Sequence, residues 1–359
     1  MPNLHTMRIL IPFTGVSHTE LLLSTKHLAM MLKAGVPLFE ALEALAEASR
    51  GKLAKVFAAV QKKVEQGEQL SRALAVYPDI FPSFYVKLVA IGESSGTLSQ
   101  NLQEIVTYLA REQELRSRIR GAMMYPVLVL VVFVLVFMAV AMFVLPNLTR
   151  VFRVLHGDIP FMTQVVIAIA DFFKAYGSIA VPAFGFAMLA FWVLLMQPFI
   201  HPVTHRMFLS IPLIGNIARQ VSIARFSRNL SLLLSAGISL HEALTIASNA
   251  ATNVVYQNAI KKVAVPVMQG EGLAAGLLAH PSLFPGFFVR IVSVGERSGK
   301  LDEALAFIAS FYDQEVEATT QNLTTLLEPL LLVVVAIFVG GFALAVITPI
   351  YEITGQLRR

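Results

Sequence analysis

The 359-residue chain contains no cysteine, and charged residues make up only 14% of it. The absence of cysteine excludes disulfides, thiolate zinc sites, iron–sulfur clusters and cysteine nucleophiles. A soluble protein carries about 25% charged residues, whereas here hydrophobic residues reach 56% and the mean hydropathy is +0.69. We therefore expect part of the chain to lie in lipid. The net charge of +5 is small, so we expect no direct nucleic-acid partner.

One sequence pattern occurs twice. The block at 92–98, Gly-Glu-Ser-Ser-Gly-Thr-Leu, returns 203 positions later at 295–301 as Gly-Glu-Arg-Ser-Gly-Lys-Leu, and the stretch 34–42 returns at 236–244. Such a register predicts a duplicated unit, in which each copy is a polar-faced domain followed by an apolar span. The repeated positions that we single out for partner contact or structure are Gly35, Glu40, Gly92, Glu93, Gly96, Gly237, Glu242, Gly295, Glu296 and Gly299.

Three stretches without a charged residue, 127–145, 177–196 and 330–348, predict transmembrane helices. A helix of 19 residues spans about 28 Å, close to the hydrocarbon thickness of a bilayer. We place these helices at 126–146, 177–197 and 329–349. The expected membrane-junction residues are Tyr125, Pro126, Glu328 and Pro329.

The distribution of arginine predicts the topology. Arginines cluster before the first span and after the second, and the 147–176 loop between them contains few basic residues. The positive-inside rule therefore places both repeats in the cytoplasm and this loop outside, together with the tail at 350–359. The inner flank of the third span is acidic and opposes this assignment, but early spans usually dominate orientation.

Each repeat has the pattern of an all-α domain of about six helices. After a short segment at 1–18, we expect a helical bundle at 19–125 and a connector with a second bundle at 198–328. Ser17 with Glu20 and Ser239 with Glu242 have the spacing of capping boxes, and Gly35 suits a left-handed helix end. Long helices starting near Leu98 and Leu301 should lead into the first and third spans. Strand signals are missing.

Apparent catalytic motifs do not meet their structural requirements. Residues 92–96 match a G-x-S-x-G nucleophile elbow, but that motif requires a preceding strand, and the second copy has Arg297 at the nucleophile position. We interpret both copies as turns between helices. Residues 295–300 resemble a phosphate loop but are one residue short, and His201 with His205 lack a third zinc ligand. We expect no enzyme activity, catalytic residue, cofactor or metal. For the repeated acids, a cap or salt bridge is the default, with a shared metal or partner contact as the alternative.

The expected spans contain no ionisable residue, which argues against a transporter. The third has small residues at Ala336, Gly340 and Gly341 that allow close helix packing. A channel or transporter, or a signalling receptor, is nevertheless the competing interpretation. A receptor is disfavoured because the external loop is too short for a folded sensor domain.

The segments leading into the first and third spans are the most specific features. They read Arg118-Ile119-x-x-Ala122-Met123-x-Tyr125-Pro126 and Glu328-Pro329-Leu330-Leu331. With the repeated blocks, they resemble the type II secretion system F / type IV pilus PilC family of inner-membrane platform proteins over about residues 20–350. The segment before the first domain is shorter than in many members.

The resemblance implies two homologous cytoplasmic helical domains, three spans and a multi-pass protein of the inner membrane. It also implies an assembly platform that couples a cytoplasmic hexameric ATPase to the assembly of pilins or pseudopilins. Further expected partners are other inner-membrane assembly proteins, second copies of the chain and the lipid bilayer. Whether the fibre serves secretion, a pilus or DNA uptake stays open.

Overall fold

The computed structural model describes residues 16–140 and 212–356, together with residues 168, 175, 176, 186 and 209. All secondary structure within these ranges is helical, as the sequence predicts. The second expected span and the 147–176 loop lie almost wholly outside the described residues. His201 and His205 also lie outside them.

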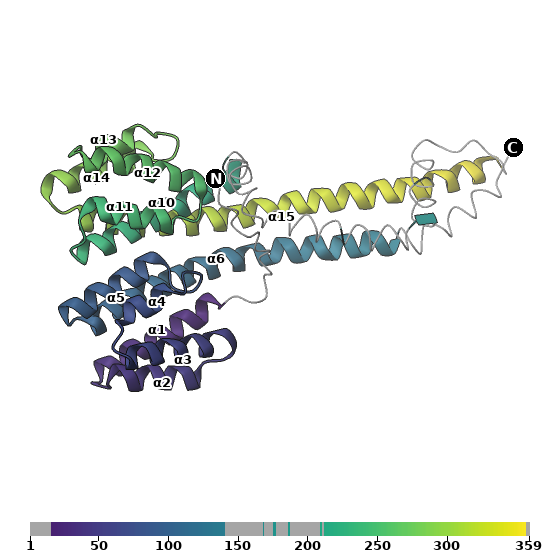
Figure 1. The fold of residues 1–359 in the computed structure, drawn as a ribbon. Coiled ribbons are helices and arrows are strands. Elements are labelled where there is room, and N and C mark those ends of the chain that lie inside the picture. The colour runs from purple at the N-terminus through teal and green to yellow at the C-terminus, as the bar shows by residue number, and fades with distance from the viewer. Residues whose placement is uncertain are drawn as a thin grey trace, which may run out of the picture. The chain divides into compact units, whose positions relative to one another are not determined.

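The helices of the second repeat follow those of the first in order, and the four short helices of each repeat also agree in length (Figure 1). The first repeat consists of α1 (His18–Lys33), α2 (Leu38–Ala48), α3 (Gly51–Glu65), α4 (Leu70–Ala75), α5 (Ser83–Ser95) and α6 (Leu98–Ala139). The second consists of α10 (Pro212–Ser235), α11 (Leu240–Ala250), α12 (Val254–Met268), α13 (Leu273–Leu278), α14 (Gly286–Ser298) and α15 (Leu301–Gln356). The predicted start points of the long helices, Leu98 and Leu301, are confirmed.

The boundaries of α1 follow from its capping residues. Ser17 and Glu20 form the predicted capping box, in which the Ser17 hydroxyl accepts from the Glu20 amide at 3.1 Å and the Glu20 carboxylate accepts from the Ser17 amide at 2.8 Å. At the other end Gly35 has a φ of 84°, and the Val36 amide donates to the Met31 carbonyl at 3.0 Å. This left-handed end, which Gly237 repeats after α10 with a φ of 79°, turns the chain into the next helix.

The second predicted capping box is wrong. Ser239 precedes α11, but its side chain makes no capping hydrogen bond. Glu242 instead forms an ion pair with Lys87 of the first repeat, with 2.5 Å between Oε1 and Nζ. A contact between the repeats has therefore replaced the local interaction that the sequence spacing favours.

Aromatic pairs at equivalent positions fill the core of each repeat. Phe81 and Tyr85 have ring centroids 5.2 Å apart, and their counterparts Phe284 and Phe288 are 5.3 Å apart. All four side chains are buried, and burial raises the pKa of the Tyr85 hydroxyl to about 12. The hydrophobic periodicity of the short helices is thus explained by packing around these rings.

The chain divides into two compact units. The first contains both repeats, Met1–Arg118 and Gln197–Thr319, and the second contains Ile119–Met196 and Thr320–Arg359. The helices α6, of 42 residues, and α15, of 56 residues, each contribute to both units without interruption (Figure 1). Pro126 lies inside α6, and α15 continues beyond the expected end of the third span to Gln356.

The apolar segments of α6 and α15 belong to the second unit. Both helices are long and apolar enough to cross a membrane. Within this unit Phe133 and Phe338 meet edge to face, with ring centroids 5.3 Å apart. Large side chains elsewhere on the same segments face outward, such as Leu128 at 59% and Ile337 at 70% exposure. Contiguous exposed apolar surface of this kind suits lipid better than water.

Candidate functional site

The repeated glutamate of the Gly-Glu block caps a neighbouring helix. Glu93 lies on α5, and its two carboxylate oxygens accept from the amides of Leu70 at 2.5 Å and Ser71 at 2.9 Å. These amides open α4 and have no partner within their own helix. A negative charge at this end also opposes the positive end of the helix dipole. Glu93 therefore fixes α4 against α5.

Glu296 repeats this geometry in the second copy. Its carboxylate accepts from the Leu273 amide at 2.5 Å and from the Ala274 amide at 3.1 Å, at the start of α13. Because the same contact with two backbone amides occurs in both repeats, the same residue, Glu, occurs at this position in both. Each of these two acids already binds two backbone amides, and within the described ranges no group of three or more His, Asp or Glu residues could hold a metal ion.

The glycines of the same block allow two helices to approach closely. A Cβ atom on Gly92 would lie 2.8 Å from the Leu98 Cα, and one on Gly295 would lie 2.5 Å from the Ala304 Cβ. Gly96, with a φ of 73°, ends α5 in the left-handed conformation, and Gly299 does the same for α14 at 70°.

The block is therefore a turn between helices, as interpreted from the sequence. Helices flank it on both sides, and the Ser94 hydroxyl donates to the Ile91 carbonyl at 2.9 Å. This geometry lacks the strand and the strained serine of a nucleophile elbow. The contacts that the Gly-Glu block makes therefore hold neighbouring helices together.

A second group of charged residues joins the two repeats. Among the residues that the structure describes, three ion pairs cross between them: Lys87 with Glu242, Glu112 with Arg225, and Arg118 with Glu317. We call this set the inter-repeat seam. Its members from the first repeat lie on α5 and α6, and those from the second lie on α10, α11 and α15.

Glu112 is the buried centre of the seam. Its side chain is only 4% exposed and accepts from Arg116 Nε and Arg225 Nε, each at 2.9 Å. Burial alone raises the pKa of Glu112, but Arg225 and Arg116 overcome this effect and hold the pKa below its ordinary value. Glu112 therefore stays ionised and binds an arginine from the other repeat.

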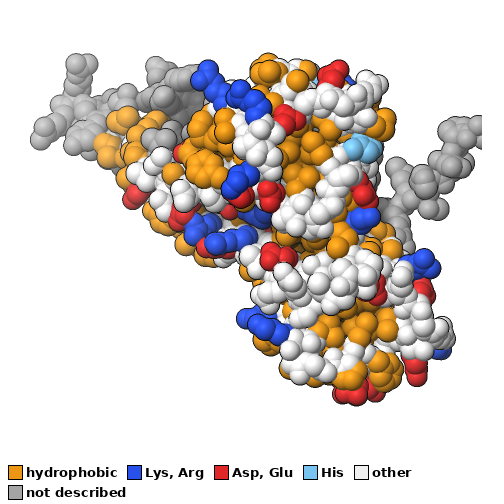
Figure 2. Space-filling view, turned by 90° about the vertical axis from the view of Figure 1, so that its left-hand side faces the viewer, with side chains coloured by type: hydrophobic (Ala, Val, Ile, Leu, Met, Phe, Trp, Pro, Cys, Tyr) orange, Lys and Arg blue, Asp and Glu red, His pale blue; other side chains and the backbone are white. Residues whose placement is uncertain are grey.

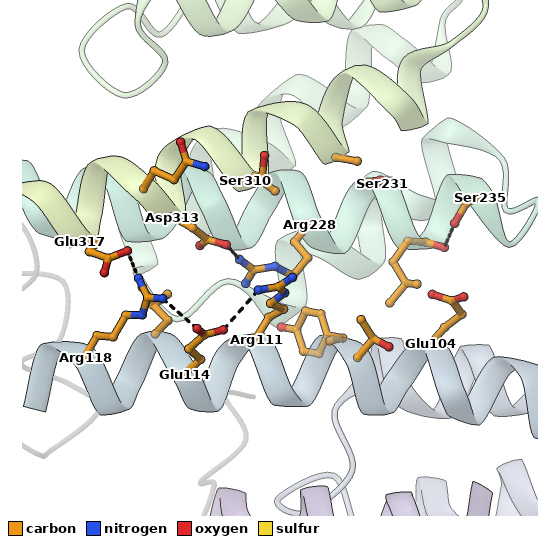
Figure 3. A pocket seen from close by; sticks show the side chains of 17 residues that line it. Glu104, Arg111, Glu114, Arg118, Arg228, Ser231, Ser235, Ser310, Asp313 and Glu317 are labelled. Carbon is orange, nitrogen blue, oxygen red and sulfur yellow. Dashed lines mark hydrogen bonds and ion pairs between the residues drawn. The ribbon is translucent and has the colours of Figure 1, made fainter. Parts of the chain in front are cut away.

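A cavity of about 550 Å³ lies beside the seam, between α6, α10 and α15 (Figure 3). In the figure Arg118 reaches from α6 toward Glu317 of α15, and Glu114 lies between Arg118 and Arg111. Residues of both signs and several hydroxyl groups line the cavity: Glu104, Thr107, Tyr108, Arg111, Glu114, Leu115, Arg118, Arg228, Ser231, Leu232, Ser235, Ala306, Ala309, Ser310, Asp313, Gln314 and Glu317.

Arg228 and Asp313 form an ion pair at the wall of this cavity. One nitrogen of Arg228 and one oxygen of Asp313 are buried and have no partner within the described residues. Buried polar atoms without a protein partner are usually satisfied by water, and a cavity of this size has room for it. The contact between the repeats thus includes a cavity that charged, hydroxyl and apolar side chains line together.

The remaining residues singled out from the sequence lie apart from the seam. Glu40, the counterpart of Glu242, is exposed on α2 and has no ion-pair partner among the described residues. Tyr125 is exposed on α6, and Glu328 and Pro329 are exposed on α15. The structure therefore brings Glu242 into the seam and leaves the membrane-junction residues on helix surfaces.

Sequence reasoning missed Glu112 and Arg225, although a signal for Glu112 was available. On α6 the residues Leu102, Ile105 and Leu109 form a buried stripe at helical spacing, and Glu112 occupies the next position of that stripe. An acid in a core position requires a buried partner. The identity of that partner, on a helix more than a hundred residues later, could not be obtained from spacing.

Comparison with known proteins accounts for the duplication. Residues 24–146 and residues 226–349 each match the family described as type II secretion system protein F. Together the two matches cover more than half of the chain. The chain belongs to the type II secretion system protein F family. The two matches begin within α1 and α10 and extend into the long helices α6 and α15.

Relatives from both branches of this family are similar over nearly the whole chain. The type IV pilus assembly protein PilC of Myxococcus xanthus is 33% identical over 98% of this chain and 84% of its own length. PilC of Thermus thermophilus is 34% identical over 96% of this chain and 84% of its own. The type II secretion system protein F of Pseudomonas aeruginosa is 32% identical over 94% of this chain and 84% of its own.

In this F family chain the seam is the contact between two family domains. Glu112 and Lys87 belong to the first matched segment, and Glu242 to the second. Arg225 lies one residue before the second match. The ion pairs thus fix one domain copy against the other within the first compact unit.

Proposed function

We propose that this F family protein is an inner-membrane assembly platform for a type II secretion or type IV pilus machine. The observation that carries the proposal is the continuity of α6 and α15. Each begins in the packed part of a repeat and extends, without a break, through an apolar segment long enough to cross a membrane. The names of the relatives, which are pilus assembly and secretion proteins, support the same role.

The proposed mechanism transmits movement along these helices. A cytoplasmic hexameric ATPase moves the repeats, and α6 and α15 carry that movement to the membrane, where pilins or pseudopilins are taken into the fibre. A helix transmits displacement because its backbone is internally hydrogen bonded along its length. The inter-repeat seam makes the two repeats respond together. The chain itself performs no enzymatic reaction in this scheme.

The proposal includes the topology expected from the sequence. Two bundles of about six helices, 19–125 and 198–328, lie in the cytoplasm. Three helices, 126–146, 177–197 and 329–349, cross the inner membrane, and the 147–176 loop and the 350–359 tail lie outside. The membrane-junction residues Tyr125, Pro126, Glu328 and Pro329 stand where the long helices enter lipid. Other inner-membrane assembly proteins and further copies of the chain complete the set of partners.

Photo-crosslinking in living cells tests the proposal. Lys62 on α3 and Lys261 on α12 are both exposed, so a photoreactive amino acid at either site leaves the packing intact. We expect capture of the hexameric assembly ATPase of the same machine from at least one repeat. A matched probe in the external loop should not capture it. Trapping of only unrelated proteins from many such positions, at normal protein levels, would overturn the ATPase contact.

A further inference from the structure

We propose that the outer face of the second repeat binds the first repeat of a second copy of this chain, through the packing that already joins the two repeats within one chain. The proposal rests on the homo-oligomeric part of the proposed function and not on the ATPase contact. It follows from a comparison of equivalent surfaces on the two repeats. Where one repeat has such a surface covered by the other repeat, the equivalent surface of the other repeat is free.

The contact between the repeats is heterologous. Helix α5 of the first repeat packs against α10 and α11 of the second. The counterparts of these helices are α14 in the second repeat and α1 and α2 in the first. No comparable packing of α14 against α1 or α2 occurs among the described helices. A two-fold arrangement would produce both contacts. We call the surface on α5 and α6, and its counterpart on α14 and α15, the receiving face; the surface on α10 and α11, and its counterpart on α1 and α2, is the inserting face. One chain therefore leaves the receiving face of the second repeat and the inserting face of the first repeat unused.

The receiving face is buried in the first repeat and exposed in the second. In the first repeat the tilted rings of Phe84 and Tyr108 pack with centroids 4.4 Å apart and are 3% and 9% exposed. Their counterparts, Phe287 and Phe311, keep the same tilted packing at 5.0 Å, but Phe287 is 47% exposed. Hydrophobic side chains are visible at the surface of the repeats between charged ones (Figure 2).

Further apolar side chains extend the free receiving face. Phe307 on α15 is 54% exposed and lies one helical turn before Phe311, and Val294 on α14 is 59% exposed and lies two turns after Phe287. The counterpart of Phe307 in the first repeat is Glu104. The free face is therefore more apolar than the one that the chain covers internally, and exposed apolar patches of this kind mark interaction sites.

The inserting face is buried in the second repeat and exposed in the first. On α10 Asn229 is 3% exposed and lies beside Tyr108. Its counterpart on α1, His27, is exposed. Leu23 and Met30 flank His27 on the same face of α1 and are 48% and 50% exposed. Residues spaced by three and four form one surface of a helix, so α1 presents an apolar stripe without a partner in the described structure.

The charges of the two free faces are complementary. The internal contact contains the ion pair between Lys87 on α5 and Glu242 on α11. The counterparts of these residues are Arg290 on α14 and Glu40 on α2. Both are exposed, and neither has an ion-pair partner among the described residues. The same pair can therefore form between Arg290 of one copy and Glu40 of the next. The contact of Glu112 with Arg225 has no such counterpart, because Leu23 replaces the arginine.

A repeated heterologous contact produces a ring or an open chain of copies. In each repeat the matched segment ends in a helix with an apolar segment. The internal packing would therefore be extended from two repeats to four or more.

Crosslinking of engineered thiols tests this contact. Two full-length versions with different affinity tags, Glu40→Cys and Arg290→Cys, are expressed together, and their membranes are treated with a bismaleimide. The natural chain contains no cysteine, so all products arise from the introduced thiols. A bismaleimide is chosen because a disulfide requires Cβ atoms about 3.5–4.5 Å apart, which a pair of long side chains does not ensure.

We expect a covalent dimer that contains both tags, at least tenfold more abundant than with either variant alone. The chain with Lys87→Cys and Glu242→Cys is the internal control and should crosslink within one molecule. Lys55→Cys with Lys261→Cys, both exposed but outside the two faces, should form no dimer. The proposal is overturned if the internal control reacts and the Glu40/Arg290 pair does not, or if Glu40→Cys alone links to itself equally well.

A charge exchange gives a second readout. Glu40→Arg should reduce the amount of copurified second copy several-fold, and Arg290→Glu in the partner copy should restore it. Neither experiment requires the ATPase or a pilin. Loss of the dimer with normal capture of the ATPase by the photoprobes would therefore contradict this inference alone, whereas a normal dimer without capture of the ATPase would contradict the proposed ATPase contact alone.

Discussion

At the scale of single residues, the repeated block is explained by hydrogen bonds and van der Waals limits. Glu93 and Glu296 each bind two amides of a six-residue helix. Such a helix is too short to be stable alone, so it depends on its cap. The neighbouring glycines are required where two helix ends touch. The same residues recur because the same contacts recur.

Replacing the capping acid should destabilise the first repeat. Glu93→Ala leaves the Leu70 and Ser71 amides without a partner, and we expect a loss of about 2 kcal/mol in the free energy of unfolding. Glu93→Gln, which keeps one acceptor oxygen, should lose less. Thermal unfolding of the detergent-purified chain measures the effect. Glu43→Ala, an exposed acid on α2, is the control; an equal loss there would contradict the capping role.

His18 should make stability depend on pH. Burial lowers its pKa, with a further contribution from Arg116, although a ring nitrogen lies 3.2 Å from the Leu109 carbonyl. A histidine whose pKa is lower in the folded state is protonated more readily in the unfolded state. Folding stability should therefore fall as the pH falls through about 6.5, the unfolded pKa.

The measurement is the midpoint of thermal unfolding at pH 7.5 and 5.5. We expect the chain to lose more stability between these values than the His18→Gln variant, because glutamine does not titrate. The other histidines are common to both proteins, so only the difference between the two curves is attributed to His18. Identical curves would argue against a half-buried, neutral His18.

At the scale of helices, local signals predict where elements begin and end but not which faces meet. Gly35 and Gly96 and the residues that open the long helices are local features, and the observed boundaries follow them. The failure at Ser239 is informative, because Glu242 there binds Lys87 of the other repeat. Partners such as Glu112 and Arg225 depend on how two folded domains pack, which spacing along the chain does not encode.

Removing one residue of the Glu112–Arg225 ion pair should destabilise the chain more than replacing both residues. Glu112→Ala leaves Arg225 facing a buried site without its acid, and we expect a loss of about 3 kcal/mol in unfolding free energy. The double variant Glu112→Leu/Arg225→Met should recover most of that loss, because two apolar side chains can pack together. A double-mutant cycle measures the coupling. A coupling near zero would contradict a buried pair between the repeats.

The contact between α14 and α15 should not tolerate an added methyl group. In Gly295→Ala the new Cβ would lie 2.5 Å from the Ala304 Cβ, so the helices must separate, at a cost of about 1–3 kcal/mol. Gly286→Ala, at the start of α14, meets nothing within 4 Å and is the matched control. Unfolding in denaturant compares the two. Equal midpoints would show that the close approach does not stabilise the turn.

At the scale of the whole chain, duplication and family membership were both evident in the sequence. The repeated blocks and the segments that precede the apolar spans indicated the F family, and two matched segments confirmed it. The sequence did not indicate that one repeat would cover a face of the other while leaving the equivalent face free. That asymmetry arises from packing between domains and provides the surface for a second copy.

The most direct test of the platform account is an insertion after Arg120 in α6. Seven glycines should interrupt the helix between the repeat and the membrane and abolish fibre assembly or secretion, with unchanged protein level. Seven alanines add about two helical turns and nearly keep the register, so they should preserve most activity. Normal assembly with the glycine insertion would contradict transmission of movement along α6.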